Sequence, residues 1–258
     1  MALYKHAYPI LEHDDEKNAV IMPGRGMSES AVLPEICVMT FFGEVLGEFV
    51  TERGAQIAAV YKSEMGDFPV YTAKYKDVQI CLMQATVGSA SIAMMSDFVI
   101  GQGVKTVIAC GSCGVLADIP AGDVIVPAVA LRDEGASYHY LPPSRDIEID
   151  LDVVSTIENV LEKEKVPYIK CKTWTTDAFY RETADMIAYR MEEGCKVVEM
   201  ECATMAAVAK FRGAKFGQLL YSGDILADVS AYDDRDWYGN ITARKKLLYL
   251  ALEVSTAL

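Results

Sequence analysis

Two carboxylate-bearing segments in the last third of the chain have residue types that could do chemistry. Glu199-Met200-Glu201 follows the β-branched run Lys196-Val197-Val198, and Ser222-Gly223-Asp224 follows an apolar run at residues 216–221. Between them, alanines and other apolar residues recur at three- and four-residue steps, which predicts a helix that ends at Gly213. In α/β sheets, ligands bind at the carboxyl ends of strands, so this strand–helix–strand segment is predicted to form a site.

A purely structural interpretation of Glu199 and Glu201 is also available. Carboxylates at a strand-to-helix junction favour the positive end of the helix dipole, and Met200 could then be a space filler. However, residues 203–214 are rich in alanine and glycine, which is typical of a helix packed closely against a sheet. Such packing would bury the carboxylates, and a buried charge needs a partner or a role. We therefore interpret them as functional.

The composition limits the classes of protein to consider. The chain has 258 residues, of which 52% are hydrophobic and 24% charged, so we expect one α/β domain over residues 1–258. A net charge of −13 disfavours nucleic acid as a partner. We expect no membrane span, because no run of eighteen apolar residues occurs, and no secretory signal, because residues 1–18 are acidic and polar.

The cysteines indicate a reducing compartment. There are seven, an odd number, and they are scattered along the chain, so we expect a cytoplasmic protein without disulfides. Cys110 and Cys113 form a CxxC pair, but no second pair or nearby histidine accompanies it. We therefore expect no metal site, and a redox role is only a minor alternative.

Two glycine-rich turns follow predicted strands, and the first of them could bind an anion. The first, Pro23-Gly24-Arg25-Gly26, follows a predicted apolar strand at residues 18–22, and its amides and guanidinium could face oxygens. The alternative is a tight turn whose Arg25 faces solvent. The second turn, Gly111-Ser112-Cys113-Gly114, follows a predicted buried strand at residues 104–110. Further elements are predicted as an antiparallel strand pair at 68–75 and 77–84, strands at 124–131 and 166–174, and helices at 88–99, 152–165, 182–193 and from 241 onward.

The carboxylate segments resemble a known family. Val198-Glu199-Met200-Glu201 with Ala203, and Ser222-Gly223-Asp224, are similar to the signature of the nucleoside phosphorylases, which include purine nucleoside phosphorylases, uridine phosphorylases and related nucleosidases. The resemblance extends to residues 18–24, 110–127 and 175–180. It implies a twisted, mixed, barrel-like sheet with helices on both sides, and a homo-oligomer, either a dimer or a trimer of dimers. It also implies phosphate-dependent cleavage of a nucleoside to a free base and ribose 1-phosphate, without a cofactor.

The resemblance also implies roles for the carboxylates. Glu201 would accept hydrogen bonds from the ribose hydroxyls and stabilise the developing cation. Met200 would pack against the sugar, with Glu199 in support. Asp224, when protonated, would donate to a ring nitrogen of the leaving purine.

Other site residues follow from the same resemblance. Phe179, in Thr175-Thr176-Asp177-Ala178-Phe179-Tyr180, would stack on the nucleobase, and the absence of a nearby Gln-x-Arg pair favours a purine. His6 would reach the ribose site of a neighbouring subunit. Gly24, Arg25 and Ser112 would bind phosphate.

The chain departs from the family pattern at the phosphate site. Ser28 stands four residues after Gly24, and Ala109 three residues before Ser112, where the family has arginines. No third arginine lies between residues 35 and 48. Hydrolysis by a nucleosidase therefore stays open, with Glu29 as the candidate for activating water. A catalytically idle nucleoside-binding protein is a third possibility.

Overall fold

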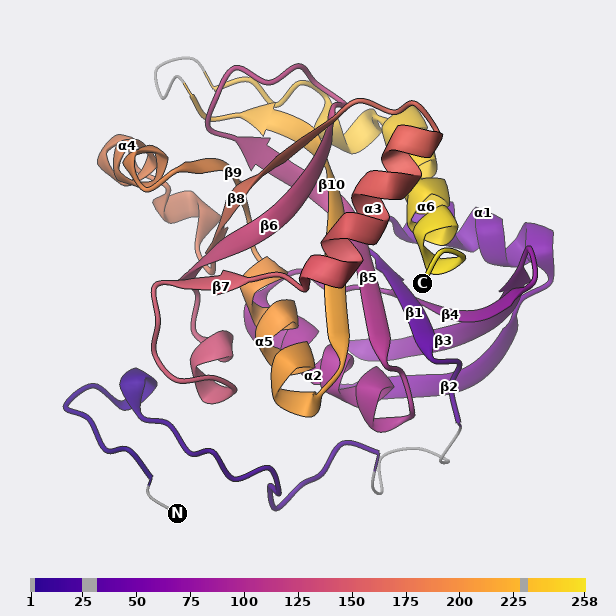
Figure 1. Cartoon of the computed structure of the whole chain (residues 1–258), viewed down its shortest axis with the longest axis horizontal. Helices are drawn as coiled ribbons and strands as arrows, with labels where there is room; N and C mark the ends of the chain where they lie inside the picture. Colours follow the sequence, from indigo (N-terminus) through magenta and orange to yellow (C-terminus); the bar gives the residue numbers. More distant parts are fainter. Residues whose placement is uncertain (1–2, 25–31, 228–231) are drawn as a thin grey trace.

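A closed ring of strands forms the centre of the computed structural model, which describes residues 3–24, 32–227 and 232–258. The strands in these residues are β1 (Ile36–Thr40), β2 (Gln56–Ser63), β3 (Gly66–Tyr75), β4 (Val78–Gln84), β5 (Thr106–Val115), β6 (Val124–Asp133), β7 (Asp146–Glu148), β8 (Tyr168–Thr176), β9 (Cys195–Glu199) and β10 (Lys215–Ile225). Five of them follow the order β10-β6-β8-β9-β5, and pairing between β5 and β10 closes the ring (Figure 1).

The other strands extend this barrel into a wing. β1 pairs in parallel with both β5 and β4, and β4, β3 and β2 continue as antiparallel neighbours. The predicted antiparallel pair is therefore confirmed as β3 and β4. β7 adds to the outer side of β6. The predicted fold class, a mixed barrel-like sheet with helices, is confirmed.

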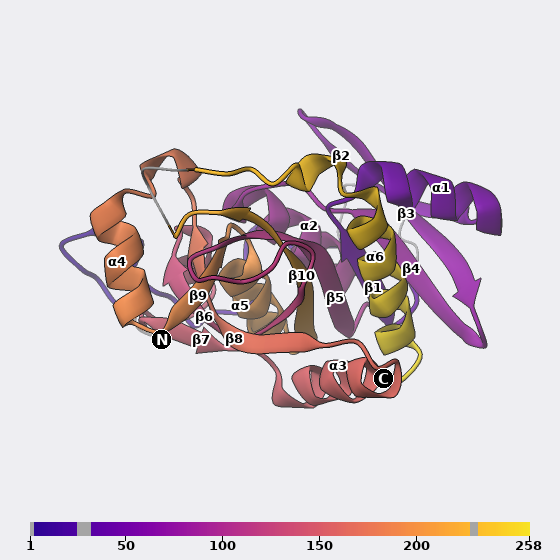
Figure 2. The ribbon, with the colours of Figure 1, turned by 90° about the horizontal axis from the view of Figure 1, so that it is seen from above.

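Six helices surround the sheet in the described part of the chain. They are α1 (Gly43–Arg53), α2 (Ser89–Gly101), α3 (Leu151–Lys163), α4 (Ala184–Glu192), α5 (Cys202–Arg212) and α6 (Ile241–Ser255), with single turns η1 (Pro9–Leu11), η2 (Ala136–His139), η3 (Phe179–Arg181) and η4 (Trp237–Gly239). Figures 1 and 2 show α3 and α6 side by side next to β10 and β5. α2 and α5 form a second packed pair.

The helix α5 is buried over most of its length, because its small side chains let it lie between the barrel and α2. All residues from Cys202 to Ala209 are buried. The helix ends as predicted at Gly213, whose φ of +76° is a left-handed conformation that glycine adopts without strain. α5 thus joins β9 to β10 and holds the first carboxylate segment at its N-terminus.

The predicted strand at residues 18–22 is wrong. These residues belong to an arm that runs along the lower edge of Figure 1 and forms no strand. Val20 and Ile21 are exposed, so the apolar run has no surface to pack against within the described chain. The arm is attached to the end of α5, where Lys17 Nζ donates to the Phe211 carbonyl at 3.0 Å.

Candidate functional site

Glu199 is the buried clamp that fixes the junction between β9 and α5. Its Oε1 accepts from the hydroxyls of Thr175 at 2.6 Å and Thr173 at 3.2 Å. Its Oε2 accepts from the backbone N–H groups of Glu201 at 2.7 Å and Cys202 at 2.6 Å. Burial raises the pKa of Glu199, and these hydrogen bonds oppose the rise. Since both oxygens are engaged, Glu199 supports its neighbour.

Glu201 lies at the N-terminus of α5 with 6% of its surface exposed. Its Oε1 accepts from the N–H of Gly88 at 2.6 Å. Gly88 has a φ of +100°, a conformation that glycine accepts and other residues rarely adopt, and it stands at the start of α2. Burial, followed by the nearby Glu199 carboxylate, raises the pKa of Glu201 to about 8. Met200, between the two carboxylates, is half-buried.

Asp177 is a site residue that the sequence analysis did not select. Its Oδ2 accepts from the N–H of Gly135 at 2.7 Å, and its Oδ1 accepts from the Ser89 hydroxyl. It therefore ties the end of β8 to the segment after β6 and to the start of α2, next to Gly88. Its charge also contributes to the raised pKa of Glu201. The signal was present, because Asp177 lies in the segment that was predicted to hold the base.

Asp224 approaches the first carboxylate segment across β5. A Cβ atom at Gly114 would lie 3.3 Å from Asp224 Oδ1 and 3.1 Å from a methyl of Val198. Gly114 also pairs with Val198 of β9. A Cβ atom at Gly114 would also lie 2.4 Å from a methyl of Leu226, so the missing side chain leaves room for Leu226, while Asp224 and Val198 both lie close to Gly114. Burial raises the pKa of Asp224, and a hydrogen bond from the Tyr232 hydroxyl opposes the rise.

The predicted arrangement of the two carboxylate segments at the carboxyl ends of neighbouring strands is not what the structure shows. β10 is parallel to β5, whereas β9 is antiparallel to β5. The carboxyl ends of β9 and β10 therefore do not share one edge of a parallel sheet. The two segments come together because the sheet closes into a barrel with β5 between them.

The turn that carries Phe179 lies beside Asp224. Phe179 is half-exposed, and the N–H of Glu182 donates to its carbonyl at 3.2 Å. Glu182 is half-buried, and its pKa is raised to about 7 by burial and then by the Asp224 carboxylate. Glu182 could not be selected from the sequence, because no local pattern distinguishes it from other glutamates at the start of a predicted helix.

The prediction that Gly24 and Ser112 bind the same phosphate is wrong for residues of a single chain, because the two residues lie far apart. A Cβ atom at Gly24 would lie 2.6 Å from the carbonyl oxygen of Gly101, at the end of α2. Gly101 precedes β5, whereas Ser112 lies six residues beyond the first residue of β5, about 20 Å along the strand. Arg25, Ser28 and Glu29 lie outside the described residues.

Ser112 has other polar neighbours. Its hydroxyl hydrogen-bonds to that of Tyr221, its partner residue on β10. The Tyr221 hydroxyl also receives a hydrogen bond from Arg244 Nε at 3.4 Å. Ala109, where the family resemblance would place an arginine, is buried in the core. The cation near Ser112 therefore comes from α6.

His6 lies in the exposed arm. Its Nδ1 accepts from the N–H of Tyr8 at 3.0 Å, and its own N–H donates to Glu12 at 3.4 Å. Its contact with a neighbouring subunit stays a prediction.

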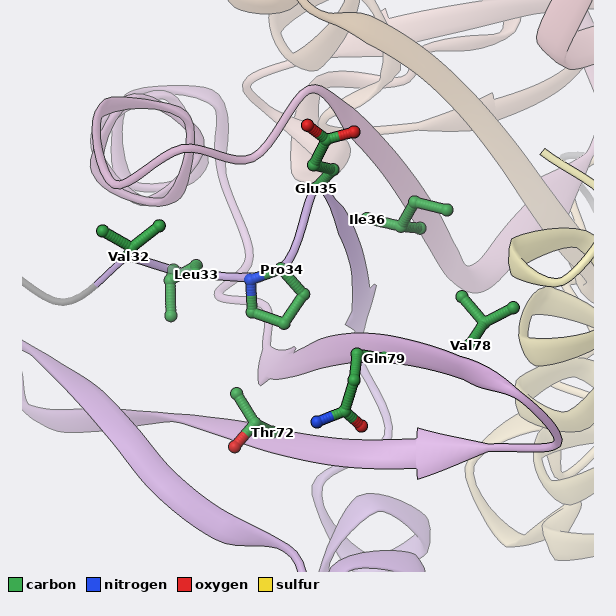
Figure 3. Close-up of a pocket in the computed structure, with 8 residues that line it drawn as sticks. All are labelled: Val32, Leu33, Pro34, Glu35, Ile36, Thr72, Val78 and Gln79. Atoms are coloured by element: carbon green, nitrogen blue, oxygen red, sulfur yellow. The ribbon is translucent and has the colours of Figure 1, made fainter.

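A surface cavity of about 600 Å³ lies away from these carboxylates, at the amino end of β1 beside β3 and β4 (Figure 3). Its lining consists of Val32, Leu33, Pro34, Glu35, Ile36, Thr72, Val78 and Gln79. None of the candidate site residues is among them. In the described residues, no group of three or more His, Cys, Asp or Glu side chains could hold a metal ion. No helix of this part of the chain is long and apolar enough to cross a membrane.

Comparison with known proteins identifies relatives over most of the chain. The phosphorylase superfamily matches residues 35–247, so the match begins at β1 and leaves out residues 18–24. A guanosine phosphorylase from Halorubrum lacusprofundi is 26% identical over 172 residues, which are 66% of this chain and 71% of that protein. The fold is similar to a uridine phosphorylase from Vibrio fischeri, with a TM-score of 0.77, 20% identity, and coverage of 93% of this chain and 99% of that chain. It is also similar to an AMP nucleosidase from Bacteroides thetaiotaomicron, with a TM-score of 0.70, 23% identity, and coverage of 87% and 88%.

Proposed function

Because the chain belongs to the phosphorylase superfamily, we propose that it is a nucleoside phosphorylase that acts on purine nucleosides in preference to uridine. The products are the free base and ribose 1-phosphate. The observation that supports the proposal most directly is the close approach of Asp224 to Val198 at Gly114, because Val198 leads into Glu199 and Glu201 and Glu199 holds the backbone of Glu201. The co-substrate is inorganic phosphate, and no cofactor or metal takes part.

Glu201 stabilises the sugar as it becomes a cation. A carboxylate can accept from two ribose hydroxyls, and its charge lowers the energy of an oxocarbenium-like sugar. Its pKa of about 8 means that the negative charge is costly in these buried surroundings. A developing positive charge next to it favours the ionised form, so the carboxylate stabilises the transition state more than the ground state.

Asp224 assists the leaving base. A phosphate oxygen forms a bond to the anomeric carbon, the glycosidic C–N bond breaks, and its electron pair moves to the purine ring. The ring then takes a proton from the Asp224 carboxyl, whose raised pKa keeps it protonated at higher pH than an ordinary aspartate. Phe179 stacks on the base from the adjacent turn.

The assembly is proposed as a homodimer or a trimer of dimers, in which His6 of one subunit reaches the ribose site of another. Native mass spectrometry measures the oligomeric state directly. A monomer that retains full activity would refute the role of His6 across an interface.

Hydrolysis by a nucleosidase is the second candidate, and one observation favours it. Gly24 packs against Gly101, ahead of β5, whereas Ser112 lies late in β5, so Gly24 does not join Ser112 in a phosphate site within the chain. Water would then take the place of phosphate and the sugar product would be free ribose.

Product analysis separates the two reactions. Purified protein is incubated with guanosine, inosine and uridine, with and without phosphate, and the sugar product is identified. Phosphorolysis predicts ribose 1-phosphate and no turnover without phosphate, whereas free ribose at saturating phosphate would assign the protein to the hydrolases. Glu201→Gln serves as the control that loses either activity. No cleavage of any nucleoside would refute both reactions.

A further inference from the structure

A buried guanidinium contacts Tyr221, the residue paired with Ser112, and is held in place by aromatic rings. Arg244, in the first turn of α6, has only 4% of its surface exposed. Its guanidinium carbon lies 4.6 Å from the ring centre of Tyr238, 5.3 Å from that of Phe42 and 5.8 Å from that of Trp237. Because these contacts restrict the side chain, the cation is oriented before any ligand arrives.

The polar contacts of Arg244 leave part of its donor capacity unused. Nη1 donates to Glu44 Oε1 at 2.5 Å, and Nε donates to the Tyr221 hydroxyl at 3.4 Å. Within the described residues, Nη2 has no acceptor. The Ser112 hydroxyl joins the same network through Tyr221. A guanidinium has five N–H donors, and an oxyanion can accept from two of them at once.

The N-terminus of α1 adds positive charge at the same place. α1 starts at Gly43, and its N-cap residue, Phe42, has no side chain that could satisfy the first N–H groups. Glu44 is the acidic residue of this first turn, and its side chain is 42% exposed. One half-exposed carboxylate therefore balances both the helix terminus and the buried guanidinium.

We propose that Arg244, Ser112 and the N-terminus of α1 form an oxyanion site, and that Glu44 occupies it until a phosphate group displaces its carboxylate. The ligand is a phosphate group, either inorganic phosphate or the phosphomonoester of a nucleotide. The proposal rests on the proposed function, because it places the phosphate beside the sugar. Ser112 and Gly114 lie on the same face of β5, about 7 Å apart, and Asp224 lies beside Gly114.

The site explains how this chain can bind phosphate without the expected arginines. Arg244 supplies a cation from the C-terminal helix in place of one at Ala109. Glu44 competes for that cation, so phosphate binding is weak. Removing the charge of Glu44 should therefore strengthen phosphate binding, whereas altering Arg244 should weaken it.

The test measures binding of inorganic phosphate to the full chain by calorimetry, without nucleoside. Glu44→Gln is expected to lower the Kd for phosphate by about tenfold or more, since the like charge is gone. Arg244→Lys keeps the charge but loses the planar fork, and is expected to raise the Kd by about tenfold. Glu48→Gln is the matched control, because Glu48 pairs with Lys245 at 2.5 Å between the same two helices, outside the site. It should leave the Kd unchanged.

A second arm uses a nucleoside 5′-monophosphate. If only this ligand responds to Glu44→Gln and Arg244→Lys, the site takes a phosphomonoester, and if inorganic phosphate responds, it takes the free anion. Unchanged Kd values for both ligands in the folded Glu44→Gln protein would refute the proposal and leave Arg244 and Glu44 as a structural ion pair. This result is independent of the proposed function, which fails instead if no nucleoside is cleaved.

Discussion

Replacing Glu201 by glutamine should reduce activity and, at alkaline pH, increase stability. The substitution keeps the size of the side chain and an oxygen that can accept from Gly88, but it removes the negative charge. In the transition state, the sugar loses the carboxylate that stabilises its positive charge. We expect kcat to fall about 30- to 1000-fold, which corresponds to about 2–4 kcal/mol in the barrier.

The stability gain follows from the raised pKa. Glu201 has a pKa of about 8 in the folded chain and an ordinary value of 4.5. Since the folded value is the higher one, the stability that the protonated carboxyl contributes is present below pH 4.5 and is lost as the pH rises to about 8. Ionisation of this buried carboxyl costs the fold about 5 kcal/mol. When the pH rises from 5 to 8, the free energy of unfolding of wild type should fall by about 3 kcal/mol more than that of the Glu201→Gln protein.

Urea denaturation of both proteins at pH 5 and pH 8 measures this difference. Subtracting the stability difference at one pH from that at the other removes any effect of altered hydrogen bonding that does not depend on pH. Glu192→Gln, an exposed position on α4, is the control and should alter neither kcat nor the pH dependence. An equal stability difference between the Glu201→Gln protein and wild type at pH 5 and pH 8 would refute the raised pKa. A kcat close to that of wild type would refute the role of Glu201 at the ribose.

Three further predictions concern the other carboxylates. Asp224→Asn should lower kcat/KM for purine nucleosides by about 10²- to 10⁴-fold. A purine nucleoside whose imidazole nitrogen is already methylated should lose much less, and an equal loss for both substrates would contradict a proton transfer. Glu182→Gln removes a negative neighbour of Asp224, so the pKa of Asp224 should fall and the alkaline decline of kcat/KM should move to lower pH. A pH profile identical to that of wild type would argue against an interaction between Glu182 and Asp224. Glu199→Gln replaces one carboxylate oxygen by an N–H₂ group, which then faces either the Thr175 hydroxyl or the N–H of Cys202, so the free energy of unfolding at neutral pH should fall by about 2–3 kcal/mol. Unchanged urea midpoints would show that the clamp is dispensable.

The strand–helix–strand segment around Glu199 and Glu201 could be predicted because its signals are local. Small residues at helical spacing and a glycine at the end define α5 from short stretches of sequence, and the structure confirms its end at Gly213. The predicted role of Glu199 as support for Glu201 is consistent with the hydrogen bonds that the structure shows, although the roles of both in catalysis stay predictions.

The error at Gly24 has a physical origin. An apolar run followed by Pro-Gly-Arg-Gly looks locally like a strand and a turn, but a strand needs a free edge to pair with. β1 lies between β4 and β5, so residues 36–40 already take the place in the sheet beside residues 106–110 of β5. The run at 18–22 therefore remains outside the sheet.

The missed residues depend on contacts between distant parts of the chain. Asp177 joins Ser89, 88 residues away in sequence, and Glu182 is distinguished only by its proximity to Asp224. No pattern within a short window encodes such pairs.

The sequence alone determined the family, the two carboxylate segments and most of the elements, though not the run at 18–22, because these depend on periodicity and on short motifs. Only the tertiary structure decided how the segments meet. Closure of the barrel places antiparallel β9 and parallel β10 on either side of β5, so that Val198 of β9 and Asp224 of β10 both come close to Gly114 of β5. The same closure and the packing of α6 bring Arg244 to Glu44 across 200 residues of chain. Burial then sets the charge state of Glu201, because desolvation depends on what surrounds a carboxyl and not on its neighbours in sequence.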